Sequence, residues 1–161
     1  MIVLLRVDER LIHGQIVVAW CKTLKITHIV AANDEIMNHE IQRDALQMAV
    51  PHDVKLAICG VSRAIEVAKD SRLAEKRVMI VTKTVKDALT MVDSIPEIPY
   101  VNIGNVGLIG RKEGVTEYLT NIRLSSEDIE DLKKIETRVP VELQMTPDSE
   151  KKTMATINRR K

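Results

Sequence analysis

Four charged side chains and a histidine lie within eight residues near the amino end of the chain, in the stretch RVDERLIHGQ that begins at Arg6. A neutral imidazole is a nucleophile, and arginine side chains neutralise the charge on phosphoryl oxygens during transfer. His13, with Arg6 and Arg10 close to it in the sequence, therefore indicates phosphoryl-transfer chemistry. Either Asp8 or Glu9 is able to hold an arginine in place or to fix the tautomer of His13, and the sequence does not choose between them.

This charged stretch is predicted to be the first loop between a strand and a helix. The apolar run before it predicts a strand over residues 2–7, and apolar residues at helical spacing predict a helix over 14–24. His13 then precedes Gly14 and Gln15 at the start of the helix, where free N–H groups and the positive end of the dipole favour an anion. An isolated loop histidine is more often a turn or capping residue, and residue chemistry alone leaves that alternative open.

The rest of the chain alternates short apolar runs with longer amphipathic segments. Further strands are predicted over residues 26–32, 53–59, 77–82, 100–104 and 140–145, and further helices over 35–49, 62–70, 85–93 and 126–136. Nearly continuous apolar strands separated by helices are typical of a parallel sheet covered on both faces. We therefore predict an α/β fold, a single three-layer domain over residues 1–161 with a mostly parallel central sheet and helices on both faces.

Two segments do not follow this alternation. The stretch TEYLTNIRL, residues 116–124, predicts an extra short strand that would be the one antiparallel strand of the fold. The tail EKKTMATINRRK, residues 150–161, is basic and amphipathic and is more typical of a solvated last helix or a frayed terminus than of a binding arm.

Several polar residues follow the predicted strands and belong to the edge where loops of an α/β sheet bind ligands. They are expected to face His13 across that edge and are Asn33, Asp34, Thr82, Lys83 and Asn105. Each of them alone is more often a helix cap or a turn residue, so both interpretations stay open.

Two other patterns are interpreted structurally. The glycines of GNVGLIG, residues 104–110, follow the spacing GxxGxxG rather than the GxGxxG of dinucleotide-binding loops, and they predict a tight turn. The apolar residues of the predicted second helix are expected to be ordinary core residues and not a cofactor site. They are Ile36, Met37, Ile41, Leu46 and Met48.

Composition excludes several classes of function. Lys and Arg number 24 against 23 Asp and Glu, and the chain has no Phe, so neither charge nor aromatic side chains favour a nucleic-acid partner. The apolar start is too short for a signal peptide and no run reaches the length of a membrane span, so we expect a cytoplasmic protein. Cys21 and Cys59 form no CxxC motif and the histidines lack zinc-site spacing, so no disulfide, metal or other cofactor is expected.

The stretch RVDERLIHGQIVVAW resembles the active-site segment of the IIB components of the mannose/fructose/sorbose family of the bacterial sugar phosphotransferase system (PTS). The segments ANDE, VTKT, VNIGNVG and VELQMTP resemble family segments in the same order, so the likeness covers nearly the whole chain. The resemblance implies that His13 is phosphorylated, that Arg10 stabilises the phosphoryl group, and that Arg6 and Asp8 line the same loop. The chain departs from the family pattern in the stretch IMNHE, which follows DE where an acidic or lysine-containing stretch is expected. Contacts of the early part of the second predicted helix with partner proteins are therefore expected to differ from those of the family.

The family resemblance also implies a relay of phosphoryl groups. A phosphohistidine of the IIA component phosphorylates His13, and His13 passes the group to a sugar that enters through the membrane components IIC and IID. The protein would then be associated peripherally with the inner face of the membrane, and neither a metal nor a nucleotide is needed at His13. Two alternatives stay open. One is a phosphohydrolase similar to histidine phosphatases, although the arginine of those enzymes adjoins the histidine in sequence and Arg10 is three residues from His13. The other is a regulatory binding module without catalysis.

Overall fold

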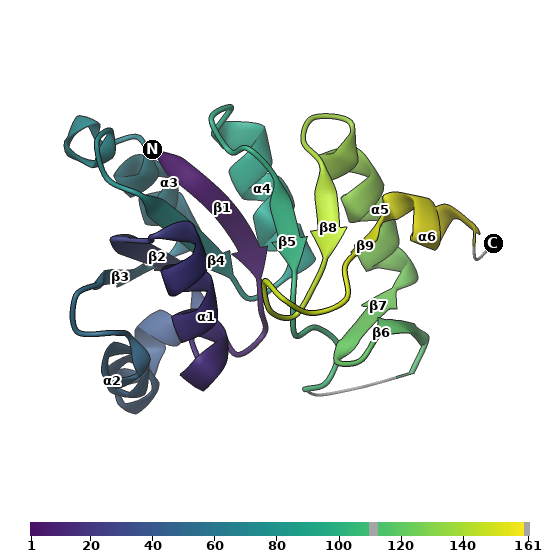
Figure 1. Cartoon of the computed structure of the whole chain (residues 1–161), viewed down its shortest axis with the longest axis horizontal. Coiled ribbons are helices and arrows are strands. Elements are labelled where there is room, and N and C mark those ends of the chain that lie inside the picture. Colours follow the sequence, from purple (N-terminus) through teal and green to yellow (C-terminus); the bar gives the residue numbers. More distant parts are fainter. Residues whose placement is uncertain (110–112, 160–161) are drawn as a thin grey trace.

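A mostly parallel sheet forms the middle layer of the protein, and helices cover both of its faces (Figure 1). The computed structural model describes residues 1–109 and 113–159. In spatial order the strands of the sheet are β3 (Lys55–Cys59), β2 (His28–Ala32), β4 (Val78–Thr82), β1 (Ile2–Val7), β5 (Val101–Ile103), β8 (Val141–Leu143) and β9 (Lys152–Thr153). The strands from β3 to β8 run parallel, and β9 pairs antiparallel with β8.

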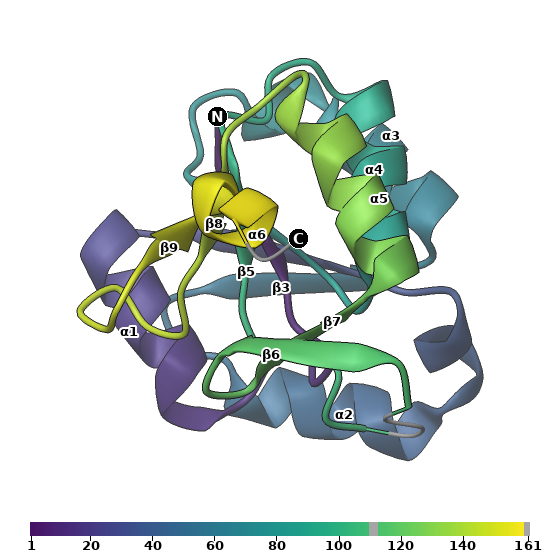
Figure 2. The same ribbon diagram turned by 90° about the vertical axis from the view of Figure 1, so that its right-hand side faces the viewer.

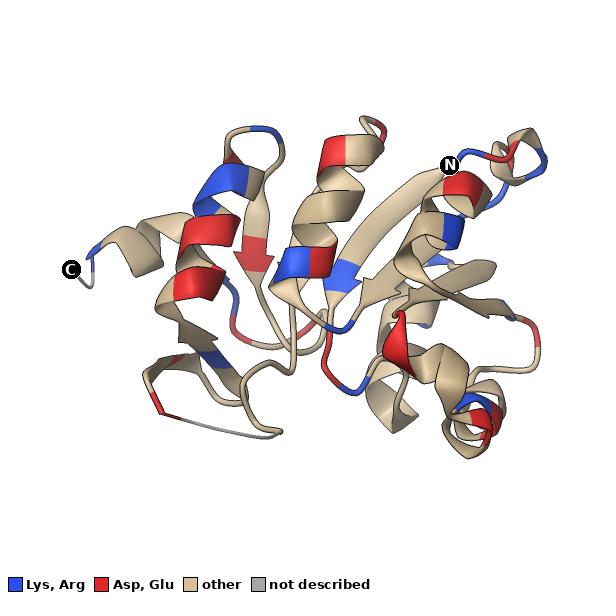
Figure 3. Ribbon diagram, turned by 180° about the vertical axis from the view of Figure 1, so that it is seen from behind, with Lys and Arg blue, Asp and Glu red and all other residues tan. Residues whose placement is uncertain are grey.

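The helices divide between the two faces of the sheet. One face carries α1 (Gly14–Leu24) and α2 (Glu40–Ala49), and the other carries α3 (Val61–Ala68), α4 (Val85–Ser94) and α5 (Ser126–Glu136) (Figure 2). On the second of these faces basic and acidic positions are interspersed (Figure 3). The short helices are η1 (Glu35–Asn38), η2 (Ser71–Leu73) and α6 (Met154–Arg159). No helix within the described ranges is long and apolar enough to cross a membrane.

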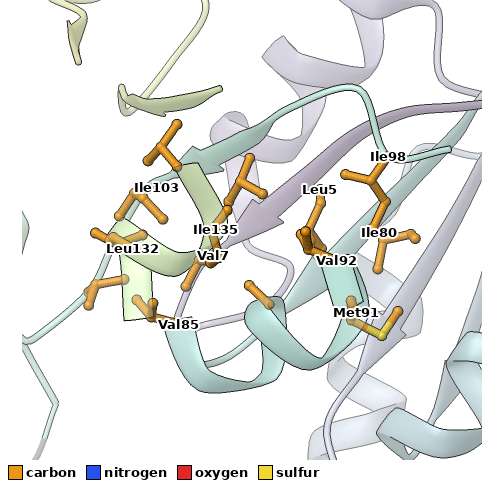
Figure 4. Packing of buried hydrophobic residues seen from close by; sticks show 14 of the residues in the cluster. Leu5, Val7, Ile80, Val85, Met91, Val92, Ile98, Ile103, Leu132 and Ile135 are labelled. Atoms are coloured by element: carbon orange, nitrogen blue, oxygen red, sulfur yellow. The ribbon is translucent and has the colours of Figure 1, made fainter. Parts of the chain in front are cut away.

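The alternation of side chains along β1 connects the core to the charged loop. Leu5 and Val7 point into the apolar cluster under α4, where both are fully buried (Figure 4). Leu4 belongs to the opposite cluster with Trp20 of α1, and Arg6 lies over the Trp20 ring. Because side chains alternate between the faces of a strand, the Arg6 side chain points to the face of the sheet that carries α1.

The second predicted helix, over residues 35–49, is two segments in the structure. His39 breaks it with a non-helical backbone (φ −125°, ψ 82°), so that η1 ends at Asn38 and α2 begins at Glu40. The expectation that all its apolar residues belong to the core was wrong, because Ile41 and Met48 are 85% and 86% exposed. Met37 is also exposed, whereas Ile36 and Leu46 are buried. Within α2, Ile41 and Met48 are five and two residues from Leu46, so at 3.6 residues per turn they lie on the side of the helix away from its buried face.

The segment that was predicted as one extra strand is a hairpin of two antiparallel strands. It consists of β6 (Val115–Leu119) and β7 (Ile122–Ser125), which are separate from the main sheet. Asn121 supplies the turn with a φ of 69°, a conformation that asparagine tolerates better than most residues. β7 leads directly into α5, where Ser125 and Asp128 form a capping box that satisfies free backbone donors at the first turn of the helix.

The tail differs from the predicted solvated or frayed end. Lys152 and Thr153 form β9, which is the antiparallel strand of the main sheet, and α6 follows at once. Met154 is fully buried and Ile157 is 4% exposed, so this helix packs on the core. The spacing of three residues between these two side chains places them on one face, which explains the packing despite the basic residues around them.

The order of the strands creates a crevice at one edge of the sheet. The neighbouring strands β1 and β4 are followed by α1 and α4, which lie on opposite faces. Both strands end at the edge drawn at the bottom of Figure 1. Such a reversal at the carboxyl ends of parallel strands is where α/β proteins bind ligands, and the loop with His13 begins there.

Candidate active site

The loop between β1 and α1 is tied to the strands on both sides of it. The backbone N–H of Asp8 donates to the Thr82 carbonyl (2.9 Å), and that of Glu9 donates to the Asn105 carbonyl (2.8 Å). A tight turn follows, in which the Leu11 N–H donates to the Asp8 carbonyl (2.8 Å) and Leu11 has a φ of 58°. Because a side chain disfavours this left-handed conformation, the loop stores local strain of the kind that clusters at functional sites.

The turn brings the His13 ring back onto Asp8. Its Nε2 lies 2.9 Å from Asp8 Oδ2 and 2.9 Å from the side-chain nitrogen of Asn105, which itself lies 3.3 Å from the same carboxylate oxygen. Among the described residues Nδ1 has no hydrogen-bond partner, and the side chain is 17% exposed. With Nε2 protonated, Asp8 therefore fixes the ring by accepting from Nε2–H, while the Asn105 side chain donates to the same Asp8 oxygen and lies against the ring. Nδ1 is left for a reactant.

Arg6 supports this arrangement from inside the protein and does not line the loop itself. Its guanidinium is 2% exposed and donates to Asp8 Oδ2 (3.2 Å), to the Gln144 carbonyl (3.2 Å) and to Asn102 Oδ1. Burial lowers the pKa of Arg6 from its ordinary value, and the Asp8 carboxylate opposes that shift. Arg6 and Asp8 are thus a buried ion pair, and removal of either partner would leave an uncompensated charge.

Gly104 makes room for the Arg6 side chain. A Cβ atom at this position would lie 2.1 Å from an Arg6 guanidinium nitrogen, and the Gly104 N–H donates to the Val7 carbonyl (2.8 Å). The first glycine of the predicted turn is therefore required by packing, while Gly107 is required by its φ of 79°. Gly110, the third, lies outside the described residues.

We expect Gly104→Ala to displace Arg6 and to lower the free energy of unfolding by roughly 1–3 kcal/mol, the usual cost of overpacking. Trp20 is the single tryptophan of the sequence, and its ring centroid lies 5.5 Å from the Arg6 guanidinium carbon. Its fluorescence emission should shift in the Gly104 variant. Gly114→Ala is the control for backbone strain without a clash, because Gly114, unlike Gly104, has a positive φ (72°) and has no atom within 4 Å of the added carbon. Its Trp20 emission should not shift. Unchanged emission in Gly104→Ala at native stability would contradict this packing.

Arg10 is the exposed arginine of the loop. Its backbone N–H donates to Asp8 Oδ1 (3.0 Å), whereas its guanidinium makes no hydrogen bond or ion pair within residues 1–109 and 113–159. His13 is the N-cap of α1 without a side-chain capping bond, and Gly14 and Gln15 after it are exposed. An uncommitted guanidinium and an open helix N-terminus therefore lie at the same end of the sheet as His13.

A groove of about 640 Å³ runs beside this loop toward α2. Arg10 and Lys83 supply its basic side chains, and Lys83 lies 3.7 Å from the exposed carboxylate of Glu35. The rest of its lining is mixed in character and includes Glu9, Leu11, Asn33, Ile36, His39, Gln42, Ala45, Leu46 and Ile109.

Three of the residues predicted at this edge make capping or turn contacts. Asn33 Oδ1 accepts the Ile36 N–H (3.0 Å) at the start of η1, and Asp34 Oδ1 accepts the Val61 N–H (2.9 Å) at the start of α3. The Thr82 hydroxyl donates to the Thr84 carbonyl (3.2 Å). These contacts hold the loops around the site but do not reach His13.

Two residues of the site were not singled out by sequence reasoning. Asn102 and Gln144 hold Arg6 from β5 and from the end of β8. Each is a buried polar residue next to apolar strand residues. The polar residue within VNI is the signal that could have found Asn102, because a buried polar side chain needs partners. Gln144 gave no such signal, because its backbone carbonyl holds Arg6 while its side chain donates to the carbonyls of Pro147 and Ser149.

Comparisons with known proteins identify the family of the chain. The family model described as PTS system sorbose subfamily IIB component matches residues 2–161. A probable phosphotransferase enzyme IIB component of Streptococcus pyogenes is 40% identical over 113 residues, which cover 70% of this chain and 69% of that protein. The mannose-specific EIIAB component of Escherichia coli K12 is 28% identical over 135 residues, which cover 84% of this chain and 41% of that protein.

A solved structure shows that the whole fold is shared as well. The IIBSor domain of the sorbose permease from Klebsiella pneumoniae superposes with a TM-score of 0.90 at 26% identity, covering 100% of this chain and 98% of that domain. The family match extends over the loop with His13, the central strands and the last helix. The chain therefore belongs to the sorbose family of PTS IIB components and has their general role in phosphoryl transfer and sugar transport.

Proposed function

We propose that His13 is the phosphoryl carrier of this IIB component. It accepts a phosphoryl group from a phosphohistidine of the IIA component and passes it to a sugar that enters through the membrane components IIC and IID. The observation that carries this proposal is the His13 ring, whose Nε2 lies at hydrogen-bond distance from Asp8, itself bonded by Asn105, while Nδ1 has no partner within the described residues. A fixed ring with one free nitrogen is suited to nucleophilic attack on phosphorus.

In the first step the lone pair of His13 Nδ1 attacks phosphorus while Nε2–H donates to Asp8. The bond between phosphorus and the donor imidazole breaks, and its electron pair stays with the donor ring, which becomes neutral. The His13 ring acquires the positive charge, and the Asp8 carboxylate at 2.9 Å stabilises it. Bonds and charges in this step balance without a metal ion or a nucleotide.

In the second step a sugar hydroxyl attacks the phosphorus on His13. The bond from phosphorus to Nδ1 breaks and its electrons return to the ring, while the hydroxyl proton is released to solvent. The free guanidinium of Arg10 is able to form two hydrogen bonds to phosphoryl oxygens in both steps, and the N–H groups at the start of α1 add positive potential. Arg6 balances the charge of Asp8, so that this carboxylate orients the ring without repelling the phosphoryl group as strongly.

Incubation of the purified protein with phosphorylated IIA tests the proposal. We expect one acid-labile, base-stable phosphoryl group per chain, located on His13 by peptide mass spectrometry, and transfer to sugar only when membranes with IIC and IID are added. Release of inorganic phosphate from small monoesters would instead support the phosphohydrolase alternative. Absence of any label with the cognate donor would support a binding module.

The encounter with IIA is expected to weaken as salt rises. A carrier has to meet its donor and then the membrane components, so its contacts must be transient, and the basic side chains of Arg10 and Lys83 at the groove are exposed to screening. The measurement is the KM for phosphorylated IIA as a function of sodium chloride concentration. A tight complex that is insensitive to salt would contradict a shuttling carrier.

A further inference from the structure

The carboxylate of Glu9 has no part in the transfer steps, yet it is fully engaged with one loop. Its Oε2 accepts the N–H of Gly107 (3.1 Å), and its Oε1 accepts those of Leu108 (2.8 Å) and Ile109 (3.0 Å). Three successive backbone N–H groups that converge on one point form a concave anion site. In this protein a side chain of the His13 loop occupies that site.

The same loop carries the residue that touches the His13 ring. Asn105 lies two residues before Gly107, and its side-chain nitrogen is 2.9 Å from His13 Nε2. The Glu9 N–H also donates to the Asn105 carbonyl (2.8 Å). Glu9 thus holds the segment 105–109 with its backbone at one end and with its carboxylate at the other.

The backbone of this segment depends on such a contact. Gly107 has a φ of 79°, and a Cβ there would lie 2.3 Å from the Arg123 carbonyl oxygen. The chain therefore passes close to β7 in a conformation that leaves three N–H groups directed to one side. Without an acceptor these donors would depend on water, and the position of Asn105 would be less constrained.

We infer that Glu9 is a positioning residue, which fixes Asn105 against the Asp8 carboxylate and the His13 ring and thereby sets the direction of Nδ1 toward the incoming phosphorus. This inference rests on the proposed role of His13 as the phosphoryl carrier. It distinguishes Glu9 from Asp8, since Asp8 bonds the ring directly and Glu9 acts through a second loop.

Phosphorylation by two donors of different size separates positioning from docking. Phosphorylated IIA needs a surface on which to dock, whereas phosphoramidate is a small donor whose P–N bond breaks as the bond to Nδ1 forms and ammonia leaves. We expect Glu9→Ala to lower the maximal rate with both donors by a similar factor, roughly ten- to hundredfold, because small misplacements of reacting groups cost that much. The KM for IIA should change less than this rate.

Glu9→Gln is the conservative variant, because its amide oxygen still accepts from Leu108 and Ile109 while its NH₂ group cannot accept from Gly107. Its rate should lie between those of the wild type and Glu9→Ala. Glu66 is the matched control, since it lies on α3 on the other face of the molecule, with a 66% exposed side chain paired with Arg63. Glu66→Ala and Glu66→Gln should leave both rates unchanged.

A loss confined to phosphorylated IIA would assign Glu9 to docking and overturn the proposal, and so would unchanged rates with both donors. The ¹⁵N chemical shifts of the His13 ring give a readout that needs no phosphoryl donor, and they should change in Glu9→Ala but not in Glu66→Ala. If the wild type is labelled by neither donor, the proposed function fails. The ring shifts then still decide the role of Glu9, because identical shifts in the wild type and Glu9→Ala would overturn it.

Discussion

Replacement of His13 by alanine is expected to abolish phosphorylation of the protein by phosphorylated IIA. The variant lacks the only side chain that presents a free imidazole nitrogen beside Asp8 and Asn105 in the described structure. The loss should be complete rather than partial, because no other group at this position can form the bond to phosphorus. The measurement is acid-labile, base-stable label per chain, together with the mass of the intact protein.

The other histidines are the controls for this prediction. His39 lies at the break between η1 and α2, and His52 lies in the turn before β3. His28 was expected in a buried strand, but it is the partly exposed first residue of β2, at the edge opposite His13. Alanine variants at these positions should retain the label. Label that persists in His13→Ala would end the assignment of His13 as the carrier.

Replacement of Arg10 is expected to slow phosphoryl transfer by about a hundredfold or more, comparable to the loss of one preorganised charge-stabilising donor. The guanidinium is exposed and unbonded within the described residues, so it is free to contact phosphoryl oxygens. Arg10→Lys should also be slow, because an ammonium group supplies charge without two parallel hydrogen bonds. The stability of both variants should stay within about 0.5 kcal/mol of the wild type, as is usual for exposed substitutions.

The rate of phosphoryl exchange with IIA and the thermal midpoint are the two measurements for Arg10. Arg63→Ala is a suitable control, since Arg63 is an exposed arginine of α3 whose partner is Glu66. It should exchange at the wild-type rate. If Arg10→Ala also does so, or if it unfolds well below the wild type, Arg10 has a structural role and the transition state is stabilised elsewhere.

Much of the fold could be predicted because local signals and tertiary packing agree. β1, α1 and α5 begin and end at the predicted residues 2–7, 14–24 and 126–136, where apolar periodicity and a capping box coincide. The position of His13 after the first strand followed from the same agreement, since the order of strands and helices determines which loops meet at the carboxyl edge. Other strands are shorter than predicted by one to three residues, as β8 shows.

The remaining features depend on contacts between distant parts of the chain. Arg6 finds Asn102 and Gln144 at separations of 96 and 138 residues, so its burial could not be deduced from the loop in which its neighbours lie. The choice between Asp8 and Glu9 was equally hidden, because the Glu9 carboxylate bonds a loop that follows β5. The break at His39 has no glycine or proline to mark it, which is why one helix was predicted there.

The position of β1 in the sheet also fixes the order in which the protein can be assembled. β1 precedes both of its neighbours in the sequence, because β4 and β5 begin only at residues 78 and 101. β2 and β3 can pair with each other much earlier, because the intervening chain is short. The strand before His13 therefore has no partner in the main sheet until the residues of β4 have been synthesised.

Gln144, whose backbone carbonyl accepts a hydrogen bond from Arg6, follows both β4 and β5 in the sequence and is therefore synthesised after them. The residues of the nucleophilic loop therefore precede in the sequence all the strands that hold β1 and Arg6 in place. The buried support of His13 is completed only when β1 is closed between β4 and β5 and the segment after β8 has reached Arg6.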